Sequence, residues 1–128
     1  MRNQVFVFGS NTSGRHGKGA ALTARQYYGA TQGQGEGPMG QSYALPTCDG
    51  RFRALLLKDI RAAVDRFFVC AKAHPELDFK VTRVGCGLAH YKDHDIAPMF
   101  IGAPDNCLFD SMWRLWLDLP ESRFWRSF

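Results

Sequence analysis

The sequence predicts an α/β layer fold built around a mixed, largely parallel sheet. Apolar segments typical of strands alternate along the chain with segments of helical periodicity, four strands with three helices between them. Glycine is concentrated where loops are predicted and is absent from the long predicted helix. Ten of the thirteen glycines lie in the first 50 residues, and none lies between Arg51 and Val84. With 128 residues, 45% of them hydrophobic, the chain (1–128) is expected to form one domain.

The first half of the chain predicts two strands around one helix. Val5–Phe8 is a continuous apolar run before a glycine, which is typical of a buried strand. Ala and Leu at helical spacing predict a helix over Gly19–Tyr28, ending at Gly29. The segment Gly33–Gly40 is too rich in glycine for a regular element and is expected to be a loop, and Gln41–Pro46 is expected to be the second strand.

The second half contains the strongest helix signal. An amphipathic helix is predicted over Leu55–Ala73, with Pro75 beyond its end, from the apolar residues Ile60, Val64, Phe67, Phe68 and Ala71. The other expected elements are strands over Phe79–Val84 and Asn106–Phe109, a short helix over Asp95–Ile101, and a terminal helix over Met112–Leu117 ended by Pro120. The aromatic residues near the carboxyl terminus fit either that helix folded onto the core or a partner surface: Trp113, Trp116, Phe124, Trp125 and Phe128.

Composition excludes several classes of function. No apolar run approaches the ~20 residues of a membrane span, and no apolar region follows the first residues as in a signal peptide. The four cysteines form no Cys-x-x-Cys pair, so a zinc site is not expected. We expect the cysteines to be reduced thiols in a cytoplasm. The net charge of +4 favours an anionic ligand. The basic residues are scattered, so nucleic acid is not the expected partner.

The first candidate site is the glycine-rich segment Gly9–Gly19, which follows a strand and opens a helix. Glycine allows close backbone approach, and a helix N-terminus offers free N–H groups and partial positive charge to a phosphate. The segment is not a Walker A loop, because Arg15 and His16 replace the required Lys-Ser/Thr, and Leu22 breaks the dinucleotide fingerprint. The alternative is a surface turn that uses glycine only for its shape.

A second glycine loop, Gly85–Tyr91, also follows a predicted strand. Ligands of open α/β sheets lie beyond the carboxyl ends of the strands. The two loops are therefore expected to close on one ligand from two sides.

Three polar residues of the first loop are the candidates for catalysis. Asn11 can bond a ribose hydroxyl or tie the turn to its own backbone. Lys18 can neutralise phosphate or orient a water molecule, or simply be solvated. His16 can act as a general acid or base near neutral pH.

In the second loop the functional and structural interpretations also stay open. Cys86 is either a thiol activated by loop N–H groups or a small residue packed behind the loop. His90 can contact phosphate or fill the site, and Tyr91 can stack on a ribose or base. His94 and its neighbours Asp93 and Asp95 can carry a proton, or Asp93 can cap the helix that follows.

At these residues the sequence resembles the macro domains, and most closely the short macro-like proteins of phages and bacteria. In that family a strand runs into an Asn and then a glycine run that opens a helix, matched here by Asn11 and Gly17–Ala21. A later strand leads into a Gly-x-Gly-x-x-Gly loop, matched by Val81–His90, although His90 stands where the family commonly has glycine. The family's strand beside the ligand is matched by Ser42–Pro46.

The resemblance implies a three-layer α/β/α fold that binds ADP-ribose, or an ADP-ribosylated macromolecule, without metal or cofactor. Some members hydrolyse ADP-ribose bonds, using an Asn that matches Asn11 to hold the distal ribose, and others only bind. Hydrolysis is thus one hypothesis and a non-catalytic binding module is the other, in the host cytoplasm if the protein is phage-encoded. The expected ligand-binding residues are Gly9, Ser10, Asn11, Gly17, Gly19, Ala20, Gly85, Cys86, Gly87, Leu88, Ala89, His90 and Tyr91.

Overall fold

The structure is a computed structural model that describes residues 3–125. Its centre is a six-stranded sheet of order β2-β3-β1-β4-β5-β6. Among the described residues, β3, β1, β4, β5 and β6 run parallel to one another and β2 pairs antiparallel with β3, so the expected α/β fold with a mixed, mostly parallel sheet is confirmed. The strands are β1 (Asn3–Asn11), β2 (Gly37–Met39), β3 (Ser42–Cys48), β4 (Leu77–Val81), β5 (Cys107–Asp110) and β6 (Phe124–Trp125).

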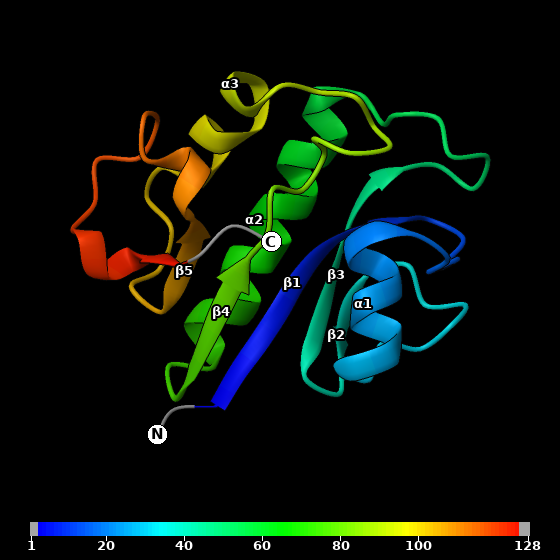
Figure 1. The fold of residues 1–128 in the computed structure, drawn as a ribbon, viewed down its shortest axis with the longest axis horizontal. Helices are drawn as coiled ribbons and strands as arrows, with labels where there is room; N and C mark the ends of the chain where they lie inside the picture. Colours follow the sequence, from blue (N-terminus) through cyan, green and yellow to red (C-terminus); the bar gives the residue numbers. More distant parts are fainter. Residues whose placement is uncertain (1–2, 126–128) are drawn as a thin grey trace.

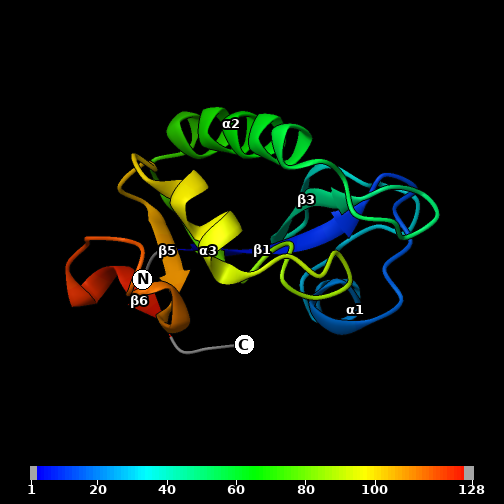
Figure 2. The ribbon, with the colours of Figure 1, turned by 90° about the horizontal axis from the view of Figure 1, so that it is seen from above.

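Helices cover both faces of the sheet and give three layers. Helix α1 (Gly19–Tyr27) lies on one face and helix α2 (Leu57–Ala73) on the other (Figures 1 and 2). The short helix α3 (Asp93–Ile96) and the 3₁₀ turn Ala97–Phe100 pack in the same core as α2. The described residues are consistent with the three-layer α/β/α arrangement.

Strand β1 divides the two cores by simple alternation. Val5 and Val7 face the larger core under α2, whereas Phe6 and Phe8 face the smaller core under α1. All four side chains are buried, because β1 lies between β3 and β4 and has a helix on each side. This explains why its sequence is a continuous apolar run rather than an alternating one.

Helix α2 forms where its periodicity predicts it. Its buried residues recur at helical spacing, and Phe67 is the largest of them. The Phe67 ring makes edge contacts with Tyr43 and Phe79 from two strands, at centroid distances of 5.0 and 5.5 Å. Val69, two residues later, points to solvent with 70% of its surface exposed.

Several expected boundaries differ from the structure. The expected loop Gly33–Gly40 is wrong in its last part, because Gly37–Met39 pairs with β3 as an edge strand. The expected helix Met112–Leu117 is also wrong: Asp110 caps only a 3₁₀ turn, Ser111–Trp113, because burial of Trp113 in the core fixes the chain there. The strand β6, just after the 3₁₀ turn Glu121–Arg123, was not predicted. Of the aromatic residues near the terminus, Phe128 lies outside the described residues.

Replacing Phe67 tests how far the fold depends on the contacts of α2 with the sheet. Phe67→Ala removes a fully buried ring, so the free energy of unfolding is expected to fall by about 3–5 kcal/mol. Val69→Ala on the same helix is the matched control and should change it by less than about 0.5 kcal/mol. Urea denaturation of both variants measures the difference, and equal losses would contradict this packing.

Candidate functional site

Three loops meet at the carboxyl edge of the parallel strands. They are the β1 loop (12–18), the β3 loop (49–56) and the β4 loop (82–92), and they follow three strands that are neighbours in the sheet. Parallel pairing brings the ends of β3, β1 and β4 to one edge, so the loops lie next to one another there (Figure 1). The prediction that the two glycine loops share one edge is consistent with this topology.

Direct contacts tie the three loops together at their bases. A Cβ placed on Gly9, near the end of β1, would lie 3.5 Å from the backbone nitrogen of Gly85. The backbone N–H of Thr12 donates to the carbonyl of Cys48 at 3.0 Å. The Tyr91 hydroxyl donates to the carbonyl of Leu55 at 2.6 Å, which joins the β4 loop to the β3 loop. Tyr91 therefore positions a loop.

Asn11 fixes the conformation of the β1 loop. Its side-chain nitrogen donates to the carbonyl of Arg15 at 2.7 Å, and its side-chain oxygen accepts from the Arg15 N–H and the Ser13 hydroxyl at 2.9 and 2.8 Å. The side chain is buried. Of the two roles predicted for Asn11, the described contacts correspond to tying the turn to its own backbone.

His16 is fully buried beneath the same loop. Its Nε2 lies 2.9 Å from the carbonyl of Gln34, so that nitrogen carries the proton, and the ring packs edge-on against Phe8. Its Nδ1 has no hydrogen-bond partner among the described residues. Ser10 is buried nearby and donates to the carbonyl of Gly35. Both side chains anchor the β1 loop to the segment that leads to β2.

The exposed part of the β1 loop offers backbone N–H groups instead of side chains. Within the described part of the chain, the N–H groups from Gly17 to Ala21 donate to no protein atom, and α1 has no side-chain cap. Lys18, the residue before the helix, is exposed and its ammonium has no partner in residues 3–125. A helix N-terminus with free donors and a nearby cation attracts anions.

The β4 loop presents a second run of free donors. The N–H groups of Gly87, Leu88 and Ala89 donate to no described atom, although Ala89 is buried. Turns at both ends hold the run in place, with His90 N–H on Gly87 and Tyr91 N–H on Gly85 at 2.9 and 3.0 Å. Successive unpaired N–H groups in a turn are a common feature of anion-binding loops.

His90 adopts the backbone conformation of a glycine. Its φ is +61°, in the left-handed region that L-residues avoid, and its side chain is exposed. Gly85 at the start of the loop has φ +79°, and a Cβ there would lie 3.0 Å from Ile96. The fold itself therefore needs glycine at Gly85 and tolerates strain at His90.

At two other positions the fold does not itself require glycine. Neither Gly17 in the β1 loop nor Gly87 in the β4 loop has a positive φ, and a Cβ on either would meet no described atom within 4 Å. Both are exposed. Glycine at these positions leaves room for close approach from outside the chain.

Cys86 is packed behind the β4 loop and is not an activated thiol. Burial raises its pKa to about 12, and the nearby Asp93 carboxylate adds to the effect, with Cys86 Sγ 3.4 Å from Asp93 Oδ1. The thiol stays protonated at neutral pH, so the interpretation of Cys86 as a structural residue is favoured over nucleophilic chemistry.

Asp93 joins the β4 loop to the remainder of the core. Its carboxylate accepts two bonds from Arg83, at 2.9 and 2.6 Å, and one from the indole N–H of the buried Trp113 at 2.8 Å. The Arg83 guanidinium lowers the pKa of Asp93, helped by Trp113 and Cys86. Of the remaining candidates, His94 is exposed, with Nε2 3.4 Å from Asp95.

The β3 loop is the part of the edge that sequence reasoning missed. Asp49, Gly50 and the residues to Arg53 directly follow a parallel strand, and that position was the available signal. The guanidinium of Arg15 crosses from the β1 loop to the carbonyl of Gly50 at 3.2 Å. The site is therefore bordered by three loops rather than two.

Known proteins give no further guide to this site. Comparison of the chain with protein-family models, curated proteins and solved structures found no match. Residues 3–125 contain no group of three His, Cys, Asp or Glu side chains able to hold a metal ion. In the same range no helix is long and apolar enough to cross a membrane.

Relief of strain at His90 should make the protein more stable. A left-handed conformation costs an L-residue about 1–2 kcal/mol, and glycine loses part of that gain to its greater chain entropy. His90→Gly is therefore expected to raise the free energy of unfolding by about 0.5–1 kcal/mol in urea titration. Gly85→Ala is the control with the opposite expected sign. It should lower the free energy of unfolding by more than about 1 kcal/mol, because Gly85 has a positive φ and an added Cβ would lie too close to the Ile96 side chain. Loss of stability in His90→Gly would contradict the strain.

The carboxylate of Asp93 should make stability depend on pH. Its pKa is lower in the folded chain than the ordinary ~3.9, so its contribution is present above that value and is lost as the pH falls through the folded pKa. Asp93→Asn is expected to cost about 2 kcal/mol at pH 7, and the difference from the unmodified chain should shrink below pH 4.

Thermal denaturation between pH 2 and pH 7 measures this effect. The control is Asp105→Asn, which removes an exposed carboxylate and should change stability by less than about 0.5 kcal/mol throughout. A difference for Asp93→Asn that stays constant across the pH range would show that the charge of Asp93 does not matter.

Proposed function

We propose that the protein binds ADP-ribose, or a closely related nucleoside diphosphate, at the edge formed by the β1, β3 and β4 loops. In this proposal the diphosphate accepts hydrogen bonds from the free backbone N–H groups of the β1 and β4 loops. Gly17 and Gly87 leave space for the phosphates, and Lys18 adds positive charge. The ligand thus contacts main-chain atoms more than side chains.

The observation that carries the proposal is the pair of unsatisfied N–H runs, Gly17–Ala21 and Gly87–Ala89. Buried backbone N–H groups without a partner are unusual in folded proteins, and one of these groups belongs to the buried residue Ala89. The others belong mostly to exposed residues, where an anion can reach them. Two such runs in adjacent loops match the two charged groups of a diphosphate better than a single phosphate or a neutral ligand. The net charge of +4 favours the same class of ligand.

The resemblance to macro domains narrows the ligand to ADP-ribose. The Gly-x-Gly-x-x-Gly pattern of the family is matched by Gly85, Gly87 and His90, and His90 has the backbone conformation that glycine takes readily. The backbone at His90 therefore has a conformation that a glycine at this position would also adopt. This supports a diphosphate loop of the family's kind.

Hydrolysis of a bond to the distal ribose is a second candidate function, and it depends on Lys18. Asn11 and His16 use their polar atoms to hold the β1 loop, so they are positioning residues in this proposal. Lys18 is exposed without a partner among residues 3–125, beside the free N–H groups, where it can orient a water molecule or stabilise a leaving group. A pure binding module needs Lys18 only for affinity.

Calorimetric titration of ADP-ribose tests the proposed site. Gly87→Ala and Gly17→Ala place a methyl group where phosphate would approach, so each should weaken binding by about tenfold or more. Both should leave the thermal midpoint of the free protein unchanged, because the added Cβ meets no described atom. Absence of binding to the unmodified protein, or unchanged affinity in both variants, would overturn the proposal.

Lys18→Ala separates hydrolysis from binding. An ADP-ribosylated peptide is incubated with each protein and release of ADP-ribose is followed by NMR. Hydrolysis that is lost in Lys18→Ala while ADP-ribose affinity falls only a few-fold supports the enzyme. The matched control is Lys72→Ala, which removes an exposed lysine in the last turn of α2. No release by the unmodified protein would leave the binding function alone.

A further inference from the structure

The segment 32–36, which leads into β2, lies against the β1 loop and is joined to it by hydrogen bonds. The Gly33 N–H donates to the carbonyl of Gly14 at 2.8 Å. His16 bonds to the same segment twice, through its backbone N–H at 3.1 Å and through its ring Nε2 at 2.9 Å. Because His16 directly precedes Gly17, these bonds fix where the run of free N–H groups begins.

The same two segments also pack backbone against backbone. A Cβ added to Gly35 would lie 2.5 Å from the carbonyl oxygen of Asn11, and one added to Gly14 would lie 2.4 Å from the backbone nitrogen of Gln34. Only glycine allows so close an approach at either position. The 32–36 segment therefore supports the β1 loop directly, and its position determines the position of the loop.

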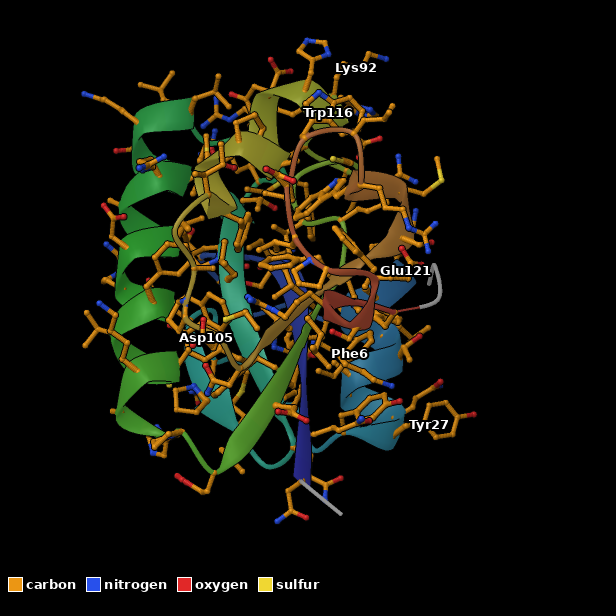
Figure 3. The ribbon with its side chains drawn as sticks, turned by 90° about the vertical axis from the view of Figure 1, so that its left-hand side faces the viewer. Phe6, Tyr27, Lys92, Asp105, Trp116 and Glu121 are labelled. Carbon is orange, nitrogen blue, oxygen red and sulfur yellow. The ribbon has the colours of Figure 1, made fainter. Side chains whose placement is uncertain are left out.

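An ion pair joins the 32–36 segment to helix α2. The Glu36 carboxylate accepts two hydrogen bonds from the Arg66 guanidinium, at 2.5 and 2.9 Å. The β1 loop leads into α1, which lies on the face of the sheet opposite to α2 (Figure 3). Arg66 directly precedes the fully buried Phe67, so its backbone is anchored in the core. Among residues 3–125, no other hydrogen bond or ion pair joins the 32–36 segment to α2.

This ion pair differs from an ordinary pair on a helix surface. Arg61 and Asp65, also on α2, are four residues apart and approach only to 3.8 Å, and exposed pairs of that type contribute little to stability. Glu36 and Arg66 are 30 residues apart, and their bidentate contact fixes orientation as well as distance. The Glu36–Arg66 pair therefore connects a loop to a packed helix, whereas Arg61–Asp65 connects residues that the helix already holds together.

We propose that the Glu36–Arg66 ion pair is a clamp that keeps the β1 loop in its ligand-binding conformation. This inference rests on the proposed function and deepens it, because it names two positioning residues outside the site that set its affinity. N–H donors that are already in place need no ordering when an anion binds. A loop that leaves this conformation for part of the time binds more weakly, in proportion to the fraction of molecules that keep it.

Glu36→Gln gives the sharpest test, because charge alone predicts the opposite result. The substitution makes the chain more positive, which by itself favours an anionic ligand. Loss of the clamp should nevertheless weaken ADP-ribose binding about threefold in calorimetric titration. Arg66→Gln makes the chain less positive and should weaken binding by a similar factor. The double variant should lose little more than either single variant, because both remove the same interaction.

Two variants on the same helix are the controls. Arg61→Gln removes the same charge as Arg66→Gln from a side chain of equal exposure, 54% against 55%, and should keep the affinity for ADP-ribose. Val64→Ala removes buried methyl groups beneath α2 and lowers the stability of the whole protein. It should also keep the affinity, because the clamp acts on the β1 loop and not through general stability.

Hydrogen exchange at the Gly33 N–H measures the clamp without any ligand. This group bonds to the carbonyl of Gly14, so it exchanges only when the contact between the two segments opens. Its exchange should be about threefold faster in Glu36→Gln and in Arg66→Gln than in the unmodified protein. The rate in Arg61→Gln should be unchanged.

The outcomes separate the clamp from the proposed function. If the unmodified protein binds ADP-ribose and Glu36→Gln binds it as tightly or more tightly, the clamp is wrong and the diphosphate site stands. Losses of similar size in Arg61→Gln or Val64→Ala would also overturn the clamp. If the unmodified protein binds no ADP-ribose, the proposed function fails, and exchange at Gly33 alone decides whether the ion pair holds the loop.

Discussion

Everything at the candidate site depends on the parallel pairing of β1 with β3 and β4. The registers place Gly9 beside Leu45, and Val7 beside Val81, so the three strands end close together. Burial of β1 on both faces fixes that register, since a slip by one residue would exchange Val7 and Phe8 between the two cores. The packing of apolar side chains thereby determines where three polar loops meet.

In the loops, the buried side chains stabilise the loop conformation, and the backbone N–H groups remain free to bind a ligand. Asn11, His16 and Ser10 face inward and hold the β1 loop by hydrogen bonds to neighbouring carbonyls and N–H groups. Asp93 does the same for the β4 loop through Arg83 and Trp113. The groups left for a ligand are then backbone N–H donors, whose positions are fixed by the loop and need little ordering when an anion binds. Preorganised donors of this type favour anion binding because that ordering cost is already met by folding.

In the described part of the chain, the non-glycine residues with a left-handed backbone lie at the same edge. Phe52 and His90 are the positive-φ residues other than glycine within the described chain, and they lie in the β3 and β4 loops. At other positions the described chain uses glycine for such conformations, as at Gly14 in the β1 loop, where a Cβ would lie 2.4 Å from the Gln34 backbone. Strained residues tend to gather at functional sites, and their positions here agree with the edge chosen from hydrogen bonding.

Local patterns in the sequence were sufficient for the alternation of strands and helices, for the amphipathic α2 and for the position of the two glycine loops. They failed where a distant contact decides the outcome. The edge strand Gly37–Met39 needs β3 beside it, and the segment after Ser111 is fixed by burial of Trp113 rather than by its own helical periodicity. The periodicity of apolar residues indicates which face of an element is buried, but it does not indicate which other element packs against that face.

The roles of individual residues depended even more on the tertiary structure. Sequence alone determined that Asn11, His16 and Lys18 stand in a glycine-rich turn before a helix, because that is a matter of order along the chain. Only the fold decided that His16 is buried against Phe8 and Gln34 while Lys18 is exposed, and that Phe52 comes to lie beside Arg15. These contacts join residues that are distant in the chain, and they arise from sheet register and core packing, which no local pattern encodes.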